Sequence, residues 1–333
     1  MFKSKVAGIY IGSQGLGVVE CSKGKIKNFA YNLYPQDLSS PSGVPTLKDN
    51  IFKVFLDNEM EIIAFLQRTM RDSKVDIESY KFVVAIPNRD LIVRFFEIPP
   101  IPRRDISATI NFEIKKYIPF KAEEIAYDFQ TRSQGAAKVI EVLFAGIKNE
   151  DLAKYNSIIK QSKIHVSAIE PSQFSLLRLL KLKKVITNKE SVVILEFGHQ
   201  DGAILIVDSG VPCFSRDIKI SMNQESADSD KETVFFRIIN EVRVSIDYFR
   251  RQFLKKAIER IIIFSKNESK ELLDTFNREL SIPVVYKNLD EIIGSKDEYS
   301  LDLAKALGFR YVASAPFVRS SYCAEEGLKW SGN

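Results

Sequence analysis

The chain opens with short apolar runs, each bordered by a polar turn that contains glycine. Residues 6–11 and 15–20 are rich in β-branched and small apolar residues and flank a Gly-Ser turn, and a third run covers 25–33. This pattern predicts an antiparallel meander. Between 47 and 70 the apolar residues instead recur every three or four positions, which predicts an amphipathic helical region.

The next part of the chain has the pattern of a small α/β segment with its own core. Strand patterns at 80–86 and 91–98 are followed by Pro99-Pro100-Ile101-Pro102, which cannot join a central ladder because proline lacks an N–H donor. A helix that begins at Asp105 or Ser107 should stop before Pro119, since the residue before proline is disfavoured in the α region. Two strands, a helix and a strand complete this part, at 125–132, 138–147, 150–163 and 166–169.

The second half repeats the opening pattern after a basic linker at 181–189. Apolar strand runs flank the turn at Gly198, just as the first runs flank Gly12. A supersecondary unit that occurs twice predicts a duplicated α/β fold in which two halves close around a cleft, with the two turns facing each other. A strand through 214–218, a helix at 231–253, a strand at 260–264, a helix at 272–280, a strand at 282–285 and a helix at 301–309 are expected to follow.

Composition narrows the classes of protein. The chain has 333 residues, 45% of them hydrophobic, which excludes wholesale disorder and suggests two domains at about 150 residues each. Its net charge is only +5, with both signs interspersed, so no nucleic-acid partner is expected. The cysteines, Cys21, Cys213 and Cys323, lie far apart, which argues against a disulfide framework or zinc site. No apolar run approaches the ~20 residues needed to span a bilayer. We expect a cytoplasmic protein that reaches a membrane only through a partner.

The two turns could have either a chemical role or a purely structural one. Gly12, Ser13 and Gly198 carry small side chains, so their backbone N–H groups could approach a phosphate closely. The alternative is that they only close hairpins, as most Gly-Ser turns do. The local pattern leaves both readings open.

A more particular motif lies in the middle segment. The stretches that carry it are Phe82-Val83-Val84-Ala85-Ile86-Pro87, Pro99-Pro100-Ile101-Pro102, Ile110-Asn111-Phe112-Glu113-Ile114-Lys115-Lys116-Tyr117-Ile118-Pro119-Phe120 and Tyr127-Asp128-Phe129-Gln130. With the repeated hairpins, the chain resembles the PilM-type branch of the actin-like ATPase superfamily, the cytosolic type IV pilus assembly proteins related to the division protein FtsA.

The resemblance implies an α/β, actin-like (ribonuclease H-like) fold with two duplicated lobes and an inserted FtsA-type 1C subdomain. Residues 1–79 and 166–190 would form the first lobe, 80–165 the inserted subdomain and 191–333 the second lobe.

The resemblance also implies a partner. PilM-type proteins bind the cytoplasmic N-terminal tail of the inner-membrane protein PilN, and this tail would lie in a groove beside the inserted subdomain. Tyr117, Ile118, Pro119 and Phe120 could supply apolar pockets for it, or could simply form the core of the subdomain. Further partners would be other pilus assembly proteins. The expected location is cytoplasmic and peripheral at the inner membrane, through a partner.

Nucleotide chemistry is where the chain departs from the superfamily. Actin-like proteins place an Asp in each phosphate hairpin to hold magnesium and its waters. The matching positions here are Tyr10, a neutral phenol, and Glu196, which is one methylene longer. The Lys that the superfamily has in the first hairpin would fall at Gly17 of this chain. The Gly-Gly pair of its adenosine-binding turn would fall at 265–268, where this chain has no glycine. We therefore expect a degenerate, non-hydrolysing nucleotide cleft, with no catalytic residue and no metal site.

Two alternatives remain open beside this scaffold hypothesis. Gly12, Ser13, Glu196 and Gly198 could still contact phosphate, in which case Mg-ATP would bind and its state would control assembly. The fold could also serve as the docking platform of a type II secretion system. The scaffold hypothesis, in which the chain couples a membrane-embedded partner to the cytoplasmic motor assembly, is the one that the sequence favours.

Overall fold

The computed structural model describes eleven stretches of the chain. They are residues 5–12, 15–22, 25–34, 59–88, 91–118, 120–133, 139–197, 201–219, 228–253, 256–264 and 270–293. These residues form two compact units, which are described separately below. The first contains the described residues up to Ile92 and Phe96–Arg178, and the second contains Val93–Phe95 and those from Leu179 onward. The helix expected at 301–309 lies outside the described residues.

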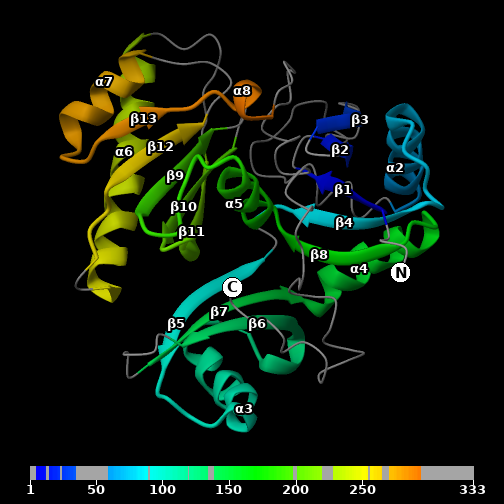
Figure 1. Cartoon of the computed structure of the whole chain (residues 1–333), viewed down its shortest axis with the longest axis horizontal. Helices are drawn as coiled ribbons and strands as arrows, with labels where there is room; N and C mark the ends of the chain where they lie inside the picture. Colours follow the sequence, from blue (N-terminus) through cyan, green and yellow to red (C-terminus); the bar gives the residue numbers. More distant parts are fainter. Residues whose placement is uncertain are drawn as a thin grey trace. The chain divides into compact units, whose positions relative to one another are not determined.

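A five-stranded sheet is the centre of the first unit. Its order is β3-β2-β1-β4-β8, with β1 antiparallel to β2, and β4 parallel to both β1 and β8 (Figure 1). The strands are β1 (Lys5–Ile11), β2 (Gly15–Ser22), β3 (Lys25–Leu33), β4 (Tyr80–Ile86) and β8 (Val166–Pro171). The meander predicted from the opening runs is therefore present, and the bounds expected for β3 and β4 match those observed.

Alternation along these strands builds the first core. Ile9 and Ile11 on β1 face the same side as Val84 on β4, and all are fully or almost fully buried. Helices α2 (Glu59–Ser73) and α4 (Asn149–Gln161) supply Ile62 and Tyr155 to this cluster. The part of the predicted helical region before Glu59 lies outside the described residues.

The second unit repeats this topology. Its sheet has the order β11-β10-β9-β12-β13, again with an antiparallel meander beside parallel strands. The elements are β9 (Ser191–Phe197), β10 (Asp201–Asp208), β11 (Val211–Lys219), α6 (Asp228–Gln252), β12 (Arg260–Phe264), α7 (Lys270–Glu279), β13 (Val284–Tyr286) and α8 (Leu289–Ile293). Helices α6 and α7 pack on the sheet through a core that includes Ile204, Val242 and Phe276. The duplication predicted from the sequence is confirmed.

A smaller sheet has the order β5-β7-β6 and lies in the first unit except for Val93–Phe95 of β5. It comprises β5 (Ile92–Ile98), β6 (Ile125–Ser133) and β7 (Ile140–Lys148). Helix α3 (Arg103–Glu113) continues into the 3₁₀ turn η3 (Ile114–Lys116), and a second 3₁₀ turn, η4 (Ala122–Glu124), precedes β6. Its separate core joins Ile110 and Ile114 to Val142 and Phe144 of β7.

The elements between 80 and 165 divide between two sheets and two cores. Strand β4 pairs with β1 and β8 in the larger sheet, and α4 packs into the larger core. Strand β7 contributes to both cores, because Val142 and Phe144 face the smaller one while Ala145 and Ile147 face the larger one. The residues with a core of their own therefore begin at β5 and end within β7.

Two helices among the described residues were not predicted from the sequence, the short α8 and the longer α5. Helix α5 (Ser172–Leu182) follows β8 directly, where we expected only the approach to a basic linker. Nearly all of its side chains, including Ser172, Gln173 and Ser175, are buried. Its polar residues Ser172, Ser175, Arg178 and Lys181 recur every three positions, so a helical period was present in the sequence and was overlooked.

Candidate functional site

The first hairpin has its backbone groups engaged within the fold. The Gly12 N–H donates to the Gly15 carbonyl at 2.9 Å and closes the turn. The Tyr34 hydroxyl donates to the Gly12 carbonyl at 3.2 Å. Ser13 lies outside the described residues. The Gly12 amide that could have faced a phosphate is thus used to close the hairpin.

Two tyrosine rings occupy the space beside the glycines of this hairpin. Tyr10 is only 4% exposed, and a Cβ added at Gly12 would lie 2.7 Å from its ring. A Cβ at Gly15 or at Gly17 would lie 2.9 or 3.1 Å from the ring of Tyr31 on β3. The glycines therefore make room for aromatic rings, which accounts for them without a bound phosphate.

Glu196 occupies in the second sheet the place that Tyr10 occupies in the first. Tyr10 lies opposite Gly17 of β2 on its antiparallel side, as Glu196 lies opposite Ala203 of β10. Glu196 is 4% exposed, so a charged carboxylate there is expensive to bury. Gly198 and residues 265–268 lie outside the described residues, so the predictions about them stay predictions.

Metal ligands do not gather in the described part of the chain. No group of three or more His, Cys, Asp or Glu side chains there is placed to hold an ion. Tyr10 supplies no carboxylate, and Glu196 alone does not make a magnesium site from the described residues.

The segment predicted to bind a partner divides into buried and exposed parts. Ile118 is 7% exposed and belongs to the core of the smaller sheet. Tyr117 is 36% exposed, and its ring stacks on that of Phe96 with centroids 4.9 Å apart and planes 17° apart. Phe120 is partly buried, with the Lys148 ammonium 4.7 Å from its ring centroid. Pro119 lies outside the described residues.

Two residues that contact this segment, Phe96 and Lys148, were not predicted. Phe96 lies on β5 and Lys148 ends β7, so each is far from Tyr117 and Phe120 in the sequence. The strand pattern predicted both strands but not their order in the sheet, so it gave no signal for these contacts.

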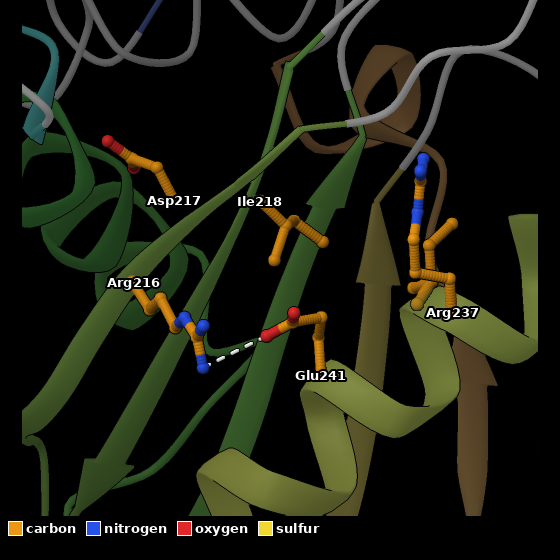
Figure 2. Close-up of a pocket in the computed structure, with 6 residues that line it drawn as sticks. Arg216, Asp217, Ile218, Arg237 and Glu241 are labelled. Atoms are coloured by element: carbon orange, nitrogen blue, oxygen red, sulfur yellow. Dashed lines mark ion pairs between the residues drawn. The ribbon is translucent and has the colours of Figure 1, made fainter.

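A separate cavity of about 300 Å³ lies in the second unit between β11 and α6 (Figure 2). Arg216 and Glu241 point toward each other across it and form an ion pair with a 2.9 Å N–O distance, while Arg237 points away from the pair. The pair is partly exposed, at 44% and 32% of the two side chains, so it contributes little to stability. The lining mixes two arginines with two acids, a combination that selects no particular ligand.

Comparison with known proteins identifies the family. The model of the type IV pilus assembly protein PilM matches residues 8–226, which is more than half of the chain. The chain belongs to the PilM family. No curated protein matches the sequence.

A solved structure of a PilM-PilN complex shows the same fold. A PilM-PilN type IV pilus biogenesis complex matches with a TM-score of 0.69 and 17% identity, over 91% of this chain and 97% of that one. The cytoplasmic domain of EpsL from the type II secretion system of Vibrio cholerae matches with a TM-score of 0.48 and 9% identity, over 91% and 94%. The actin-like fold of the PilM family, predicted from the sequence, is confirmed. None of the helices in the described part of the chain combines the length and apolar character needed to span a bilayer.

Proposed function

We propose that this member of the PilM family is a scaffold of type IV pilus assembly that binds the cytoplasmic N-terminal tail of a PilN-like inner-membrane protein. The observation that carries the proposal is the half-exposed ring of Tyr117, stacked on the buried ring of Phe96, together with the partly buried ring of Phe120 beside Lys148. The solved complex with the same fold contains a PilM and a PilN, which supports a partner of this kind.

The geometry of this surface suits an extended peptide. The Tyr117 ring is held by its stacking on Phe96, so little conformational freedom is lost when a side chain of the tail packs on it. Ile118 is anchored in the core directly after Tyr117 and fixes the backbone there. Lys148 places a positive charge beside the Phe120 ring, where it would favour a carboxylate of the tail.

Binding of a synthetic tail peptide tests this proposal. We expect Tyr117→Ala to weaken capture of a PilN-type tail by about 1–3 kcal/mol, the range of an interface anchor. Tyr248→Ala is the matched control, because Tyr248 is 43% exposed but lies on α6. Equal affinity of both variants and the wild-type chain, measured by fluorescence anisotropy on folded protein, would refute the assignment.

We also propose that the nucleotide cleft is degenerate and that the scaffold works without ATP. Tyr10 offers a neutral phenol in place of an acid, and the Gly12 N–H is already bonded to Gly15. Both features remove interactions that a magnesium triphosphate would need. Glu196 retains a carboxylate and favours the alternative, in which Mg-ATP binds and controls assembly.

Thermal melting separates these two candidates. A ligand that binds only the native state stabilises it by mass action, by ~2.7 kcal/mol at 100 times its Kd. The degenerate cleft predicts the same midpoint with and without millimolar Mg-ATP. A clear upward shift would support the nucleotide-controlled alternative.

A further inference from the structure

Helix α3 carries a large aromatic side chain on its outward face. Phe112 is 66% exposed, whereas Ile110 and Ile114 are fully buried against the smaller sheet. Helix α3 packs on one face of this sheet through these two residues (Figure 1). Single exposed apolar residues are common on protein surfaces, so the charges around the ring decide what it could contact.

Positive charge surrounds Phe112. Lys115 and Lys116 lie one turn after it, and two turns before it Asp105 is in line with the ring, with Arg104 beside Asp105. The Lys116 ammonium is 5.9 Å from the Phe112 ring centroid. Glu113 pairs with Lys116 at 2.7 Å and Asp105 with Arg104 at 3.7 Å, while Lys115 forms no ion pair with a described residue. The face therefore has more cations than anions around one projecting ring.

We propose that this face of α3 lies on an anionic lipid surface, with Phe112 entering the headgroup region and the three cations contacting lipid phosphates. The described cavity lies in the other unit, and Phe112 projects from a convex helix rather than lining a groove, which suits a deformable bilayer better than a folded acidic partner. A basic helix face with an apolar residue is the usual means of interfacial binding.

The inference deepens the proposed function and in part rests on it. One aromatic ring and a few cations bind a membrane weakly alone. Tyr117 follows Lys116 directly, so a tail of a membrane protein bound there would hold α3 close to the bilayer. The lipid contact then acts as the second of two linked interactions, whose effects multiply.

Vesicle flotation of the full chain tests the lipid contact without any peptide. We expect binding to phosphatidylcholine vesicles that contain phosphatidylglycerol, little binding to pure phosphatidylcholine, and loss of binding as salt is raised. Phe112→Ala and the pair Arg104→Glu with Lys115→Glu should each lower the bound fraction several-fold. All three side chains are exposed, so circular dichroism should show folded variants.

Matched controls separate this contact from the general positive charge of the protein. Phe236→Ala removes an aromatic ring that is 42% exposed on α6, and Lys160→Glu with Arg251→Glu makes the same change in net charge elsewhere. These controls should bind as the wild-type chain does. Equal losses in the control pair and the α3 pair, unchanged binding of Phe112→Ala, or no binding to anionic vesicles at low salt would overturn the proposal.

A cross-comparison keeps the two proposals distinguishable. Tyr117→Ala should leave vesicle binding unchanged, and Phe112→Ala should leave the affinity for the tail peptide unchanged. If Phe112→Ala lowers only peptide affinity, the face of α3 belongs to the protein interface and the lipid assignment fails.

Discussion

At the scale of single residues, the first hairpin shows how one glycine pattern can serve two purposes. Gly12 is one of the residues that could contact a phosphate, but in the structure Gly12, Gly15 and Gly17 each lie against a tyrosine ring. These rings fill the space beside the glycines from within the fold. The sequence could not distinguish these outcomes, because the ring of Tyr31 reaches the hairpin from a neighbouring strand.

Substitution of these glycines should reveal their packing role. A Cβ at Gly15 would lie 2.3 Å from the Asn32 carbonyl oxygen, a backbone atom that cannot easily move. We expect Gly15→Ala to destabilise the fold by about 1–3 kcal/mol, as overpacking does. Gly17→Ala meets only a ring atom of Tyr31, at 3.1 Å, and should cost less. Urea denaturation of both variants measures the difference, and a cost for Gly17→Ala that matched or exceeded that for Gly15→Ala would contradict this account.

A buried carboxylate forms a polar cluster elsewhere in the first sheet. Glu20 accepts hydrogen bonds from Tyr80, from Lys27 at 3.0 Å and from Asn28 at 2.6 Å. Burial raises the pKa of Glu20, but these donors together outweigh burial and hold that pKa below its usual value. Burial, together with the bond to Glu20, raises the pKa of Tyr80 from 10.0 to about 12.

The pH dependence of stability follows from these directions. Tyr80 has a higher pKa folded than unfolded, so its contribution is complete below pH 10.0 and is lost as the pH rises through about 12. Glu20 has a lower pKa folded, so its contribution is lost as the pH falls below 4.5 and through its folded pKa. We expect Tyr80→Phe to lose about 1–3 kcal/mol at neutral pH and to show a shallower alkaline decline. Denaturant titrations across pH would refute this if the alkaline slopes were equal.

At the scale of elements, β7 contributes fully buried residues to both cores of the first unit. Phe144 packs on Tyr127, with ring centroids 5.1 Å apart, in the smaller core, and Ile147 lies in the larger core with Tyr155 of α4. Both Phe144 and Ile147 are completely buried. Strand β6 also reaches the larger core, through the partly buried Ala126, so we expect damage to one core to affect the other.

This coupling can be measured by hydrogen exchange. Phe144→Ala should destabilise the fold by about 3–5 kcal/mol through the cavity that it leaves. It should also lower amide protection in α4, although Tyr155 lies in the other core. Ile125→Val, a smaller change in the smaller core, is the control and should leave α4 protected. Unchanged protection of α4 in Phe144→Ala would mean that the two cores open independently.

Apolar runs with clear polar borders were the elements predicted most closely. The expected bounds of β4 and β12 agree with the observed ones because both are apolar runs bordered by polar residues. Helix α5 was overlooked although its polar residues recur every three positions. In the segment predicted to bind a partner, the helical period changes at the 3₁₀ turn Ile114–Lys116. The sequence therefore predicted both Tyr117 and Ile118 as partner contacts, although only Tyr117 is exposed.

At the scale of the whole molecule, the repeated sheet order explains why the fold was predictable while the chemistry was not. Each sheet needs only apolar alternation, and both halves retain it. Nucleotide binding would depend instead on the chemistry of a few positions, such as Tyr10 and Glu196. The order of the strands therefore does not reveal whether a nucleotide binds.

An acid introduced at position 10 tests whether a carboxylate there allows Mg-ATP to bind. Tyr10 is 4% exposed and lies beside Gly12, so Tyr10→Asp should bury a carboxylate and cost at least ~2 kcal/mol. We expect its melting midpoint to fall and to stay unresponsive to Mg-ATP, whereas the control Tyr10→Phe should melt close to the wild-type chain. A midpoint of Tyr10→Asp that rose with Mg-ATP would show that the phenol alone had closed the cleft.

The shared strand also determines how a mechanical load would pass through the protein. Strand β7 is hydrogen bonded along its whole length to β6 and continues directly into α4, without a flexible linker. Tension applied at the smaller sheet would shear many backbone hydrogen bonds at once before it could separate that sheet from the rest. A protein that is pulled by a membrane anchor would benefit from this arrangement, because strain would reach the larger sheet as a rigid displacement.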